Sequence, residues 1–157
     1  PEEIAALWQD QENELSRIAL LLIYTGLRPS ELLNIKVEDI HIEERYMRGG
    51  SKTEAGKNRI IPIAKKVLPL LTKQLETVGK TLFPMSYRKL HSEWNKHPLL
   101  KNHLPHDGRH TCATLLDDAG VNLKIRQLIL GHASSDITNR VYTHKNVAQL
   151  IEAIDAI

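Results

Sequence analysis

The segment NELSRIALLLIYTGLRPSEL, residues 13–32, joins a long apolar stretch to two signals that end and restart a helix. Its apolar side chains recur every three or four residues, which is typical of the buried face of a helix, at Leu15, Ile18, Ala19, Leu22 and Ile23. Gly26 stands where a left-handed helix end is favoured, and Pro29 suits the first turn of a new helix. The segment therefore predicts a helix over 13–27, a break at Arg28, and a short second helix.

Beyond residue 35 the apolar period changes from that of a helix to that of a strand. Alternating stretches at 40–42 and 45–47, and a third stretch at 59–63, predict three strands. The glycines at 49 and 50 and the polar residues that follow, up to 58, predict a loop. Because Pro62 cannot donate to a ladder, it favours an edge position for the third strand. A small three-stranded antiparallel sheet is the expected result.

The remaining segments predict further helices, bounded by glycine, proline and capping residues, at 2–8, 64–78, 85–97, 104–116, 122–130, 135–142 and 146–157. The sequence contains no internal repeat and no linker long enough to divide it. The predicted fold class is therefore α+β and mostly helical, a single domain over 1–157 with a small three-stranded antiparallel sheet.

Composition limits the class of protein. Of the 157 residues, 41% are hydrophobic and 25% charged, which is ordinary for a globular fold and excludes disordered and collagen-like chains. The longest apolar run, 18–24, is far shorter than the roughly 18–20 residues that cross a bilayer. No export signal precedes it, and a lone Cys112 fits a reducing compartment. We expect a cytoplasmic protein with no membrane partner, and the missing initiator Met indicates a fragment of a longer chain.

Basic residues are unevenly placed along the chain. Residues 1–83 carry 12 Lys and Arg against 12 Asp and Glu, whereas 84–145 carry nine against five and hold seven of the eight histidines. Within 45–66, seven basic residues accompany a single acid, Glu54. This pattern favours contact between one surface and a polyanion. A solvated basic surface is the alternative interpretation.

Two segments in the first half carry candidate phosphate-binding groups. Arg28 lies at the break between two helices, where a guanidinium can face an anion beside free backbone N–H groups, and Glu31 could hold it in place. Lys52, in the predicted loop, could act as a proton donor or as a point charge beside a phosphate. Considered alone, each residue is more typical of an ordinary surface side chain.

The segment HDGRHT, residues 106–111, places two reactive groups one helical turn apart. His106 and Arg109 are three positions apart, so a helix aims both at one target. A competing interpretation takes His106 and His110 as metal ligands on one helix face. Asp107 stands where zinc proteases carry glutamate, and no third ligand has an obvious spacing, which weakens the metal interpretation.

The last candidate segment runs from the helix end at Gly131 to Tyr142. His132 directly follows the glycine and is well placed to donate a hydrogen bond outward. Tyr142 is a candidate nucleophile, or else a half-buried packing ring. Neither residue is decisive when considered alone.

Considered together and in order, these segments resemble the catalytic domain of the tyrosine recombinase, or phage integrase, family. The matching text is TGLRPSE at 25–31, RIIPI at 59–63, HDGRHT at 106–111 and LGH at 130–132, with Tyr142 beyond. The SKT loop at 51–53 looks closer to the loop in integrases of phages and conjugative elements than to that in chromosome-dimer resolvases. The resemblance implies six catalytic residues, which are Arg28, Lys52, His106, Arg109, His132 and Tyr142. It also implies two supporting residues, Glu31 and His110.

The reaction that the resemblance implies is transesterification at a DNA phosphodiester without metal, cofactor or ATP. Tyr142 would attack the phosphorus and form a 3′-phosphotyrosyl link, which preserves the bond energy for rejoining. Arg28, Arg109 and His132 would bind the non-bridging oxygens. Lys52 would protonate the leaving 5′ oxygen, and His106 would take the proton of the tyrosine.

The resemblance also implies the partners. These are double-stranded DNA, three further copies of the chain in a synaptic tetramer, and accessory DNA-bending or excision factors. We expect the family's N-terminal core-binding domain to be absent from residues 1–157. The apolar stripe of 146–157 would dock on its own domain or on a neighbouring protomer. The rival functions are relaxation of DNA by a type IB topoisomerase, a non-catalytic DNA-binding module, and a zinc hydrolase.

Overall fold

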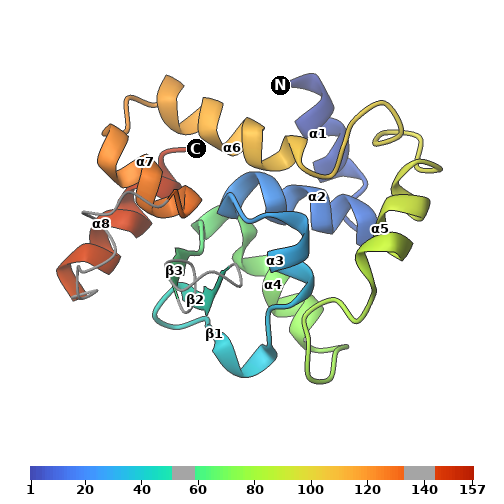
Figure 1. The fold of residues 1–157 in the computed structure, drawn as a ribbon, viewed down its shortest axis with the longest axis horizontal. Helices are drawn as coiled ribbons and strands as arrows, with labels where there is room; N and C mark the ends of the chain where they lie inside the picture. Colours follow the sequence, from blue (N-terminus) through green and yellow to red (C-terminus); the bar gives the residue numbers. More distant parts are fainter. Residues whose placement is uncertain (51–58, 133–143) are drawn as a thin grey trace.

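The structure, a computed structural model, describes residues 1–50, 59–132 and 144–157. The helices within these residues are α1 (Glu2–Gln9), α2 (Glu14–Thr25), α3 (Pro29–Leu33), α4 (Leu68–Leu75), α5 (Tyr87–Trp94), α6 (Asp107–Asp118), α7 (Leu123–Leu130) and α8 (His144–Asp155). The strands are β1 (Ile40–His41), β2 (Tyr46–Gly49) and β3 (Arg59–Pro62), and single 3-10 turns occupy Val37–Asp39 and Lys65–Val67. The mostly helical α+β fold is thereby confirmed (Figure 1).

Helix α2 begins and ends as its sequence predicts. Asn13 caps it by accepting a hydrogen bond from the backbone N–H of Leu15, and Gly26 ends it in the left-handed conformation, with φ of 66°. A Cβ atom at Gly26 would lie 2.9 Å from Leu130 Cδ2 and 3.2 Å from Cys112 Sγ. Glycine is therefore required here both for its positive φ and for the close packing of α6 and α7.

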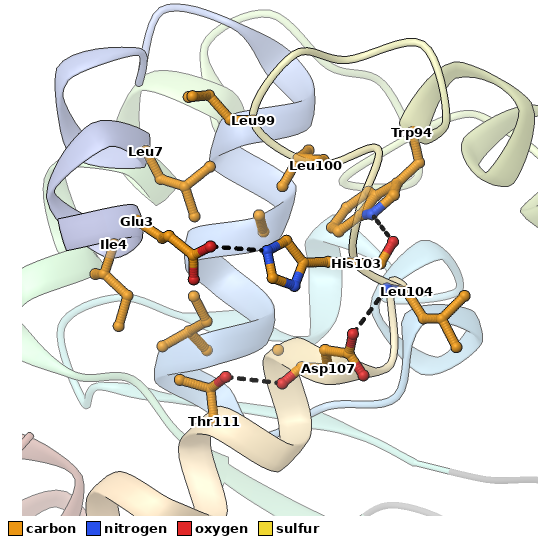
Figure 2. Close-up of a pocket in the computed structure, with 13 residues that line it drawn as sticks. Glu3, Ile4, Leu7, Trp94, Leu99, Leu100, His103, Leu104, Asp107 and Thr111 are labelled. Carbon is orange, nitrogen blue, oxygen red and sulfur yellow. Dashed lines mark hydrogen bonds and ion pairs between the residues drawn. The ribbon is translucent and has the colours of Figure 1, made fainter. Parts of the chain in front are cut away.

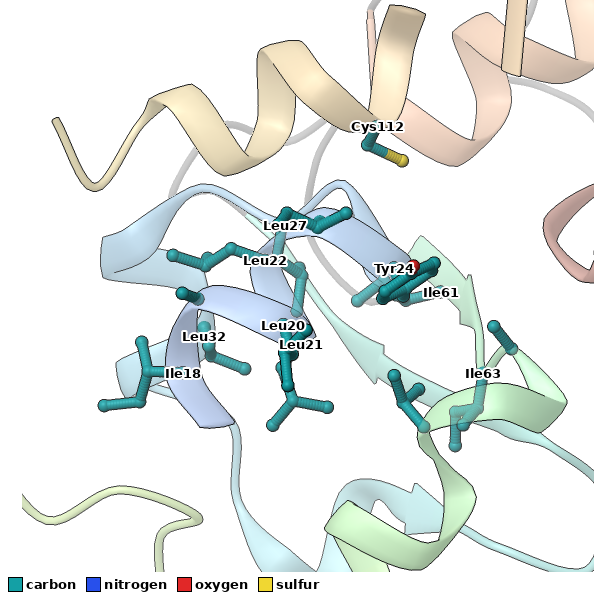
Figure 3. Close-up of a cluster of buried hydrophobic side chains, with 14 of the residues drawn as sticks. Ile18, Leu20, Leu21, Leu22, Tyr24, Leu27, Leu32, Ile61, Ile63 and Cys112 are labelled. Carbon is teal, nitrogen blue, oxygen red and sulfur yellow. The ribbon is translucent and has the colours of Figure 1, made fainter. Parts of the chain in front are cut away.

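The hydrophobic core surrounds α2, whose residues from Ile18 to Thr25 are all buried. Helix α6 lies across α2 (Figure 1), and its Cys112 side chain points toward Tyr24 and Leu27 (Figure 3). The two helices approach closely at Gly108, where a Cβ atom would lie 2.7 Å from that of Leu22. This approach fixes the start of α6, where the candidate site residues His106, Arg109 and His110 lie.

The sheet has the order β1-β2-β3 with antiparallel pairing, and Met47 lies opposite Ile61. Pro62 lies in β3, an edge strand as predicted. Strand β2 extends through Gly49, for which the sequence predicts a loop. The structure places Gly49 opposite Arg59, where a Cβ atom would lie 2.5 Å from Ile35 Cδ1. The glycine is a strand residue that makes room for a core side chain.

Several predicted helices are shorter than expected. The segment 64–78 divides into a 3-10 turn and α4, which begins one residue before Pro69. Helix α5 starts only after Ser86, whose hydroxyl accepts a hydrogen bond from the N–H of Lys89. Helix α6 begins at Asp107 rather than near Leu104. Residues 51–58 of the predicted loop lie outside the described residues. So does the predicted helix over 135–142.

Helix α8 packs on its own chain, against β3 and α7. Leu150 and Ile154 are buried there. At the end of the helix, Asp155 pairs with Arg45 and accepts a hydrogen bond of 2.7 Å from the N–H of Lys65. Docking of this segment on its own domain is thus the arrangement found. In the part of the chain that the structure describes, no helix is long and apolar enough to cross a membrane.

Candidate active site

The break between α2 and α3 presents Arg28 above a buried carboxylate. Arg28 precedes Pro29 in an extended conformation, and its backbone N–H donates to Glu31 Oε2 over 2.8 Å. Its guanidinium Nη1 donates to the other oxygen, Oε1, over 3.0 Å. Glu31 is only 4% exposed, whereas the side chain of Arg28 is 37% exposed. One carboxylate therefore orients both the backbone and the accessible guanidinium of Arg28.

A second arginine, Arg59, contacts the same carboxylate from the first position of β3. Its Nη2 lies 3.1 Å from Glu31 Oε2, and its Nη1 donates to the carbonyl of Ile129 over 2.8 Å. The side chain is buried. The prediction that Arg59 belongs to a surface basic patch is therefore wrong. The available signal was its position directly before the apolar stretch IIPI, which indicates burial. A buried guanidinium in turn requires a partner such as a carboxylate.

Arg109 has a buried guanidinium whose Nη2 nitrogen is available for a further hydrogen bond. Its Nη1 donates to the carbonyl of Gly26 over 2.7 Å, and its Nη2 is buried without a hydrogen-bond partner among the described residues. Burial lowers the pKa of Arg109 to about 10, and the charges of Arg28 and Arg59 contribute. A buried donor without an acceptor is costly, so this group gains by donating to an anion.

His132 follows the end of α7, where Gly131 adopts a φ of 63°. Its backbone N–H donates to the carbonyl of Gln127 over 3.0 Å, which fixes the turn that carries the imidazole. Partial burial lowers the pKa of His132, and the positive charges of Arg109, Arg28 and Arg59 lower it further. The imidazole is therefore neutral at pH 7 and can donate one hydrogen bond.

His106 lies at the start of α6, one turn before Arg109 and on the same face, as the sequence predicts. Its ring meets that of His110 edge-on, with centroids 4.9 Å apart. Burial lowers the pKa of His106, followed by the charges of His110, Arg109 and Arg28. His106 is thus a neutral imidazole within electrostatic reach of both site arginines, and the exposed His110 packs beside it.

The opposite side of the same helix start faces a small separate cavity (Figure 2). Asp107 accepts a hydrogen bond of 2.8 Å from the N–H of Leu104, and its carbonyl accepts one of 2.9 Å from the Thr111 hydroxyl. Asp107 therefore closes the turn that leads into α6. His103, which pairs with Glu3 over 3.1 Å, also lines the cavity, but none of the candidate site residues does.

The zinc interpretation needs a third ligand beside His106 and His110. Across residues 1–50, 59–132 and 144–157, no group of three or more His, Cys, Asp or Glu side chains could hold a metal ion. Asp107, the nearest acid in sequence, is committed to the turn before α6. These residues offer an imidazole pair and two guanidinium groups, which suit a phosphate better than a cation.

Four of the six candidate catalytic residues are coupled electrostatically, since the charges of Arg28 and Arg109 lower the pKa of both His106 and His132. Glu31 lies beneath Arg28 and His110 lies beside His106. Lys52 and Tyr142 lie outside the described residues. The described set is a cationic, partly buried group of side chains, whose donors suit an anion such as a phosphate.

The two shifted histidines predict how stability depends on pH. Both have a pKa below the ordinary 6.5 in the folded chain, so the unfolded chain binds protons first as the pH falls. Their contribution to stability is therefore complete above about pH 6.5 and decreases below it. Replacing both with glutamine is expected to flatten the decrease between about pH 6.5 and 5, where carboxylates stay ionised. Urea unfolding at half-unit pH steps checks this, and an unchanged slope would contradict it.

The fold and this cationic site define a class of protein, the catalytic domains of the tyrosine recombinases. Residues 1–149 match the sequence profile described as the Phage integrase family, and the chain belongs to that family. It is 34% identical over 172 residues to the tyrosine recombinase XerA of Pyrococcus horikoshii, and the alignment covers 98% of this chain and 59% of that relative. The resemblance found in the motifs is thereby confirmed.

Solved structures show the same fold. A crystal structure of XerA recombinase superposes with a TM-score of 0.69 at 27% identity, covering 90% of this chain and 59% of that one. The Tn1549 transposon integrase in complex with transposon right end DNA gives 0.67 at 23% identity, covering 97% and 64%. The chain therefore spans about three fifths of the length of these relatives.

Proposed function

We propose that residues 1–157 are the catalytic domain of a site-specific DNA recombinase, which cleaves and rejoins DNA through a 3′-phosphotyrosyl intermediate on Tyr142. The observation that carries the proposal is the buried Nη2 of Arg109, which has no hydrogen-bond partner among the described residues and lies near a second arginine that is oriented by Glu31. Two guanidinium groups from different elements match the two non-bridging oxygens of a phosphodiester. Family membership supplies the chemistry that such a site would perform.

The described residues would stabilise the charge that develops during cleavage. Arg28 and Arg109 would each donate to a non-bridging oxygen, and fixed donors of this kind contribute about 2.7–4 kcal/mol each to the transition state. His132, neutral because its pKa is lowered, would donate a further hydrogen bond. No metal ion or nucleotide takes part in this proposal.

Proton transfer would use groups on either side of the phosphorus. A tyrosine has a pKa of about 10, so Tyr142 must lose its proton as it attacks. His106 would accept that proton, since its lowered pKa keeps the imidazole neutral at pH 7. Lys52 would give a proton to the departing 5′ oxygen. Supporting contacts would come from Glu31 beneath Arg28 and from His110 beside His106.

The proposed partner is double-stranded DNA, held mainly through its phosphates. Exposed basic side chains on the described surface include Arg48, Arg88, Lys89 and Lys124. The DNA complex of the Tn1549 integrase, which shares the fold, supports this choice of partner. Since phosphate contacts release counterions, binding should weaken steeply as salt is raised.

Assembly into a synaptic tetramer, with accessory DNA-bending or excision factors, is part of the proposal. Residues 146–157 are the proposed contact between protomers. Because Leu150 and Ile154 are buried on their own chain, α8 would have to remake the same apolar contacts on a neighbour. The surface it covers includes β3 and α7, so both arrangements would use one binding surface.

Capture of a covalent DNA adduct tests the proposal. The probe is a pool of nicked duplexes with a randomised core, incubated with the protein in EDTA. Adducts that survive denaturation are recovered and sequenced to give the cleaved site. The expected result is an adduct with the native protein and none with Tyr142→Phe. An adduct that persists in this variant, or that requires a divalent metal, would overturn the proposal, and relaxation of a plasmid without strand exchange would favour the topoisomerase function.

A further inference from the structure

Arg59 occupies a junction between two parts of the site that are far apart in sequence. It begins β3, is 4% exposed, and directs one arm of its guanidinium toward α3 and the other toward α7. The two acceptors lie 28 and 70 positions away along the chain. A buried guanidinium that bridges two elements in this way fixes their relative position.

The first arm reaches Arg28 through Glu31. Arg59 Nη2 donates to Glu31 Oε2 over 3.1 Å, and the same oxygen accepts the backbone N–H of Arg28. The other carboxylate oxygen accepts the Arg28 guanidinium. Because the carboxylate is shared, its orientation, and hence that of Arg28, depends on both of its cationic partners.

The second arm reaches the turn that carries His132. Arg59 Nη1 donates to the carbonyl of Ile129, the next-to-last residue of α7. A Cβ atom at Gly131 would lie 2.6 Å from Arg59 Nε, so the end of the helix lies directly against the guanidinium. The residue after this glycine is His132, which therefore projects from a turn that Arg59 supports.

We propose that Arg59 is a positioning residue, which fixes the distance between Arg28 and His132 by binding Glu31 and the end of α7 at once. The inference rests on the proposed function, in which both residues contact one phosphate. The planar fork of arginine places two N–H groups in fixed directions, whereas the ammonium of a lysine cannot reproduce both contacts. The role requires the shape of the side chain as well as its charge.

Two variants separate shape from charge. Arg59→Lys keeps the charge and loses the fork, and Arg59→Met loses both. On the duplex recovered by adduct capture, we expect Arg59→Lys to form the adduct about 100-fold more slowly, as a displacement of about 1 Å can cause, with DNA affinity within about threefold of the native protein. Rates are taken in single turnover at saturating protein and divided by the folded fraction.

A matched control tests whether lost hydrogen bonds alone slow the reaction. Arg17, on α2, donates to the carbonyls of Gln11 and Glu12 and to the side chain of Gln74, away from the site. Arg17→Met should lower stability and leave the adduct rate of the folded protein unchanged. A native rate in Arg59→Lys, or an equal fall in Arg17→Met, would overturn the inference.

A readout without DNA distinguishes this inference from the proposed function. The titration of His132, followed by nitrogen-15 NMR of its ring, should move to higher pH in Arg59→Met, since a charge that lowers its pKa is removed. In Arg59→Lys the titration should stay within a few tenths of a pH unit of the native curve. If the native protein forms no adduct, the proposed function fails. Separately, an unchanged His132 titration in Arg59→Met would overturn the link between Arg59 and His132.

Discussion

Arg109→Lys is expected to slow DNA cleavage by about 10²–10³-fold, the effect of removing one fixed donor from an oxyanion site. The guanidinium uses Nη1 to hold the carbonyl of Gly26, which leaves Nη2 for the phosphate. A lysine has one nitrogen and cannot serve both acceptors in the same geometry. Burial would also lower the pKa of the new ammonium and weaken its charge.

The measurement for Arg109 is the single-turnover rate of adduct formation at saturating protein, with DNA affinity determined separately by a gel shift. Arg17→Lys is the control, because Arg17 also donates to backbone carbonyls but lies away from the site. Arg109→Lys should bind DNA with little change, since one phosphate contact among several is altered. Cleavage at the native rate would show that Nη2 is not a phosphate donor.

The second large effect concerns stability. Glu31→Ala is expected to lower the free energy of unfolding by about 3–5 kcal/mol, because it leaves the buried guanidinium of Arg59 without its carboxylate. It also removes the acceptor for the N–H of Arg28. Urea unfolding at pH 7 measures the loss. Glu38→Ala, which removes an exposed carboxylate 3.8 Å from Lys36, should stay within about 0.5 kcal/mol of the native protein.

Acid should reproduce part of this loss in the native protein. Burial raises the pKa of Glu31, but the charges of Arg59 and Arg28 lower it, and the net shift is downward from 4.5. The stabilisation is therefore complete above about pH 4.5 and decreases as the pH falls toward the folded-state pKa. In Glu31→Gln the free energy of unfolding should decrease less over this pH range.

Equal stability of Glu31→Ala and Glu38→Ala at pH 7 would contradict the role of the buried carboxylate.

The sequence predicts the fold well where the signal is local. The apolar spacing of α2, its end at Gly26 and the restart at Pro29 all depend on neighbouring residues, and the structure has each of them. Gly49 was misassigned because a glycine is the usual sign of a loop, whereas here it accommodates Ile35, which contacts it from outside the strand. Such a contact leaves no trace in the residues beside it.

The same distinction applies to the site. The pairs Arg28 with Glu31 and His106 with Arg109 are three positions apart, so helical spacing alone predicts that they lie together. Arg59 was assigned to the surface because its partners come from α3 and the end of α7. A charged residue ahead of an apolar strand carries no information about which distant carboxylate neutralises it. The roles of Lys52 and Tyr142 stay predictions, since both lie outside the described residues.

The carbonyl of Gly26 links the end of a core helix to the candidate active site. Because Arg109 donates to this oxygen, and because Leu130 and Cys112 pack close to the same glycine, loosening of this corner would displace Arg109, the proposed phosphate ligand. Under the proposed function, mild heat or low concentrations of urea should therefore abolish adduct formation before the chain unfolds. Under the same proposal, substitutions that rigidify this corner would widen the temperature range over which the adduct forms.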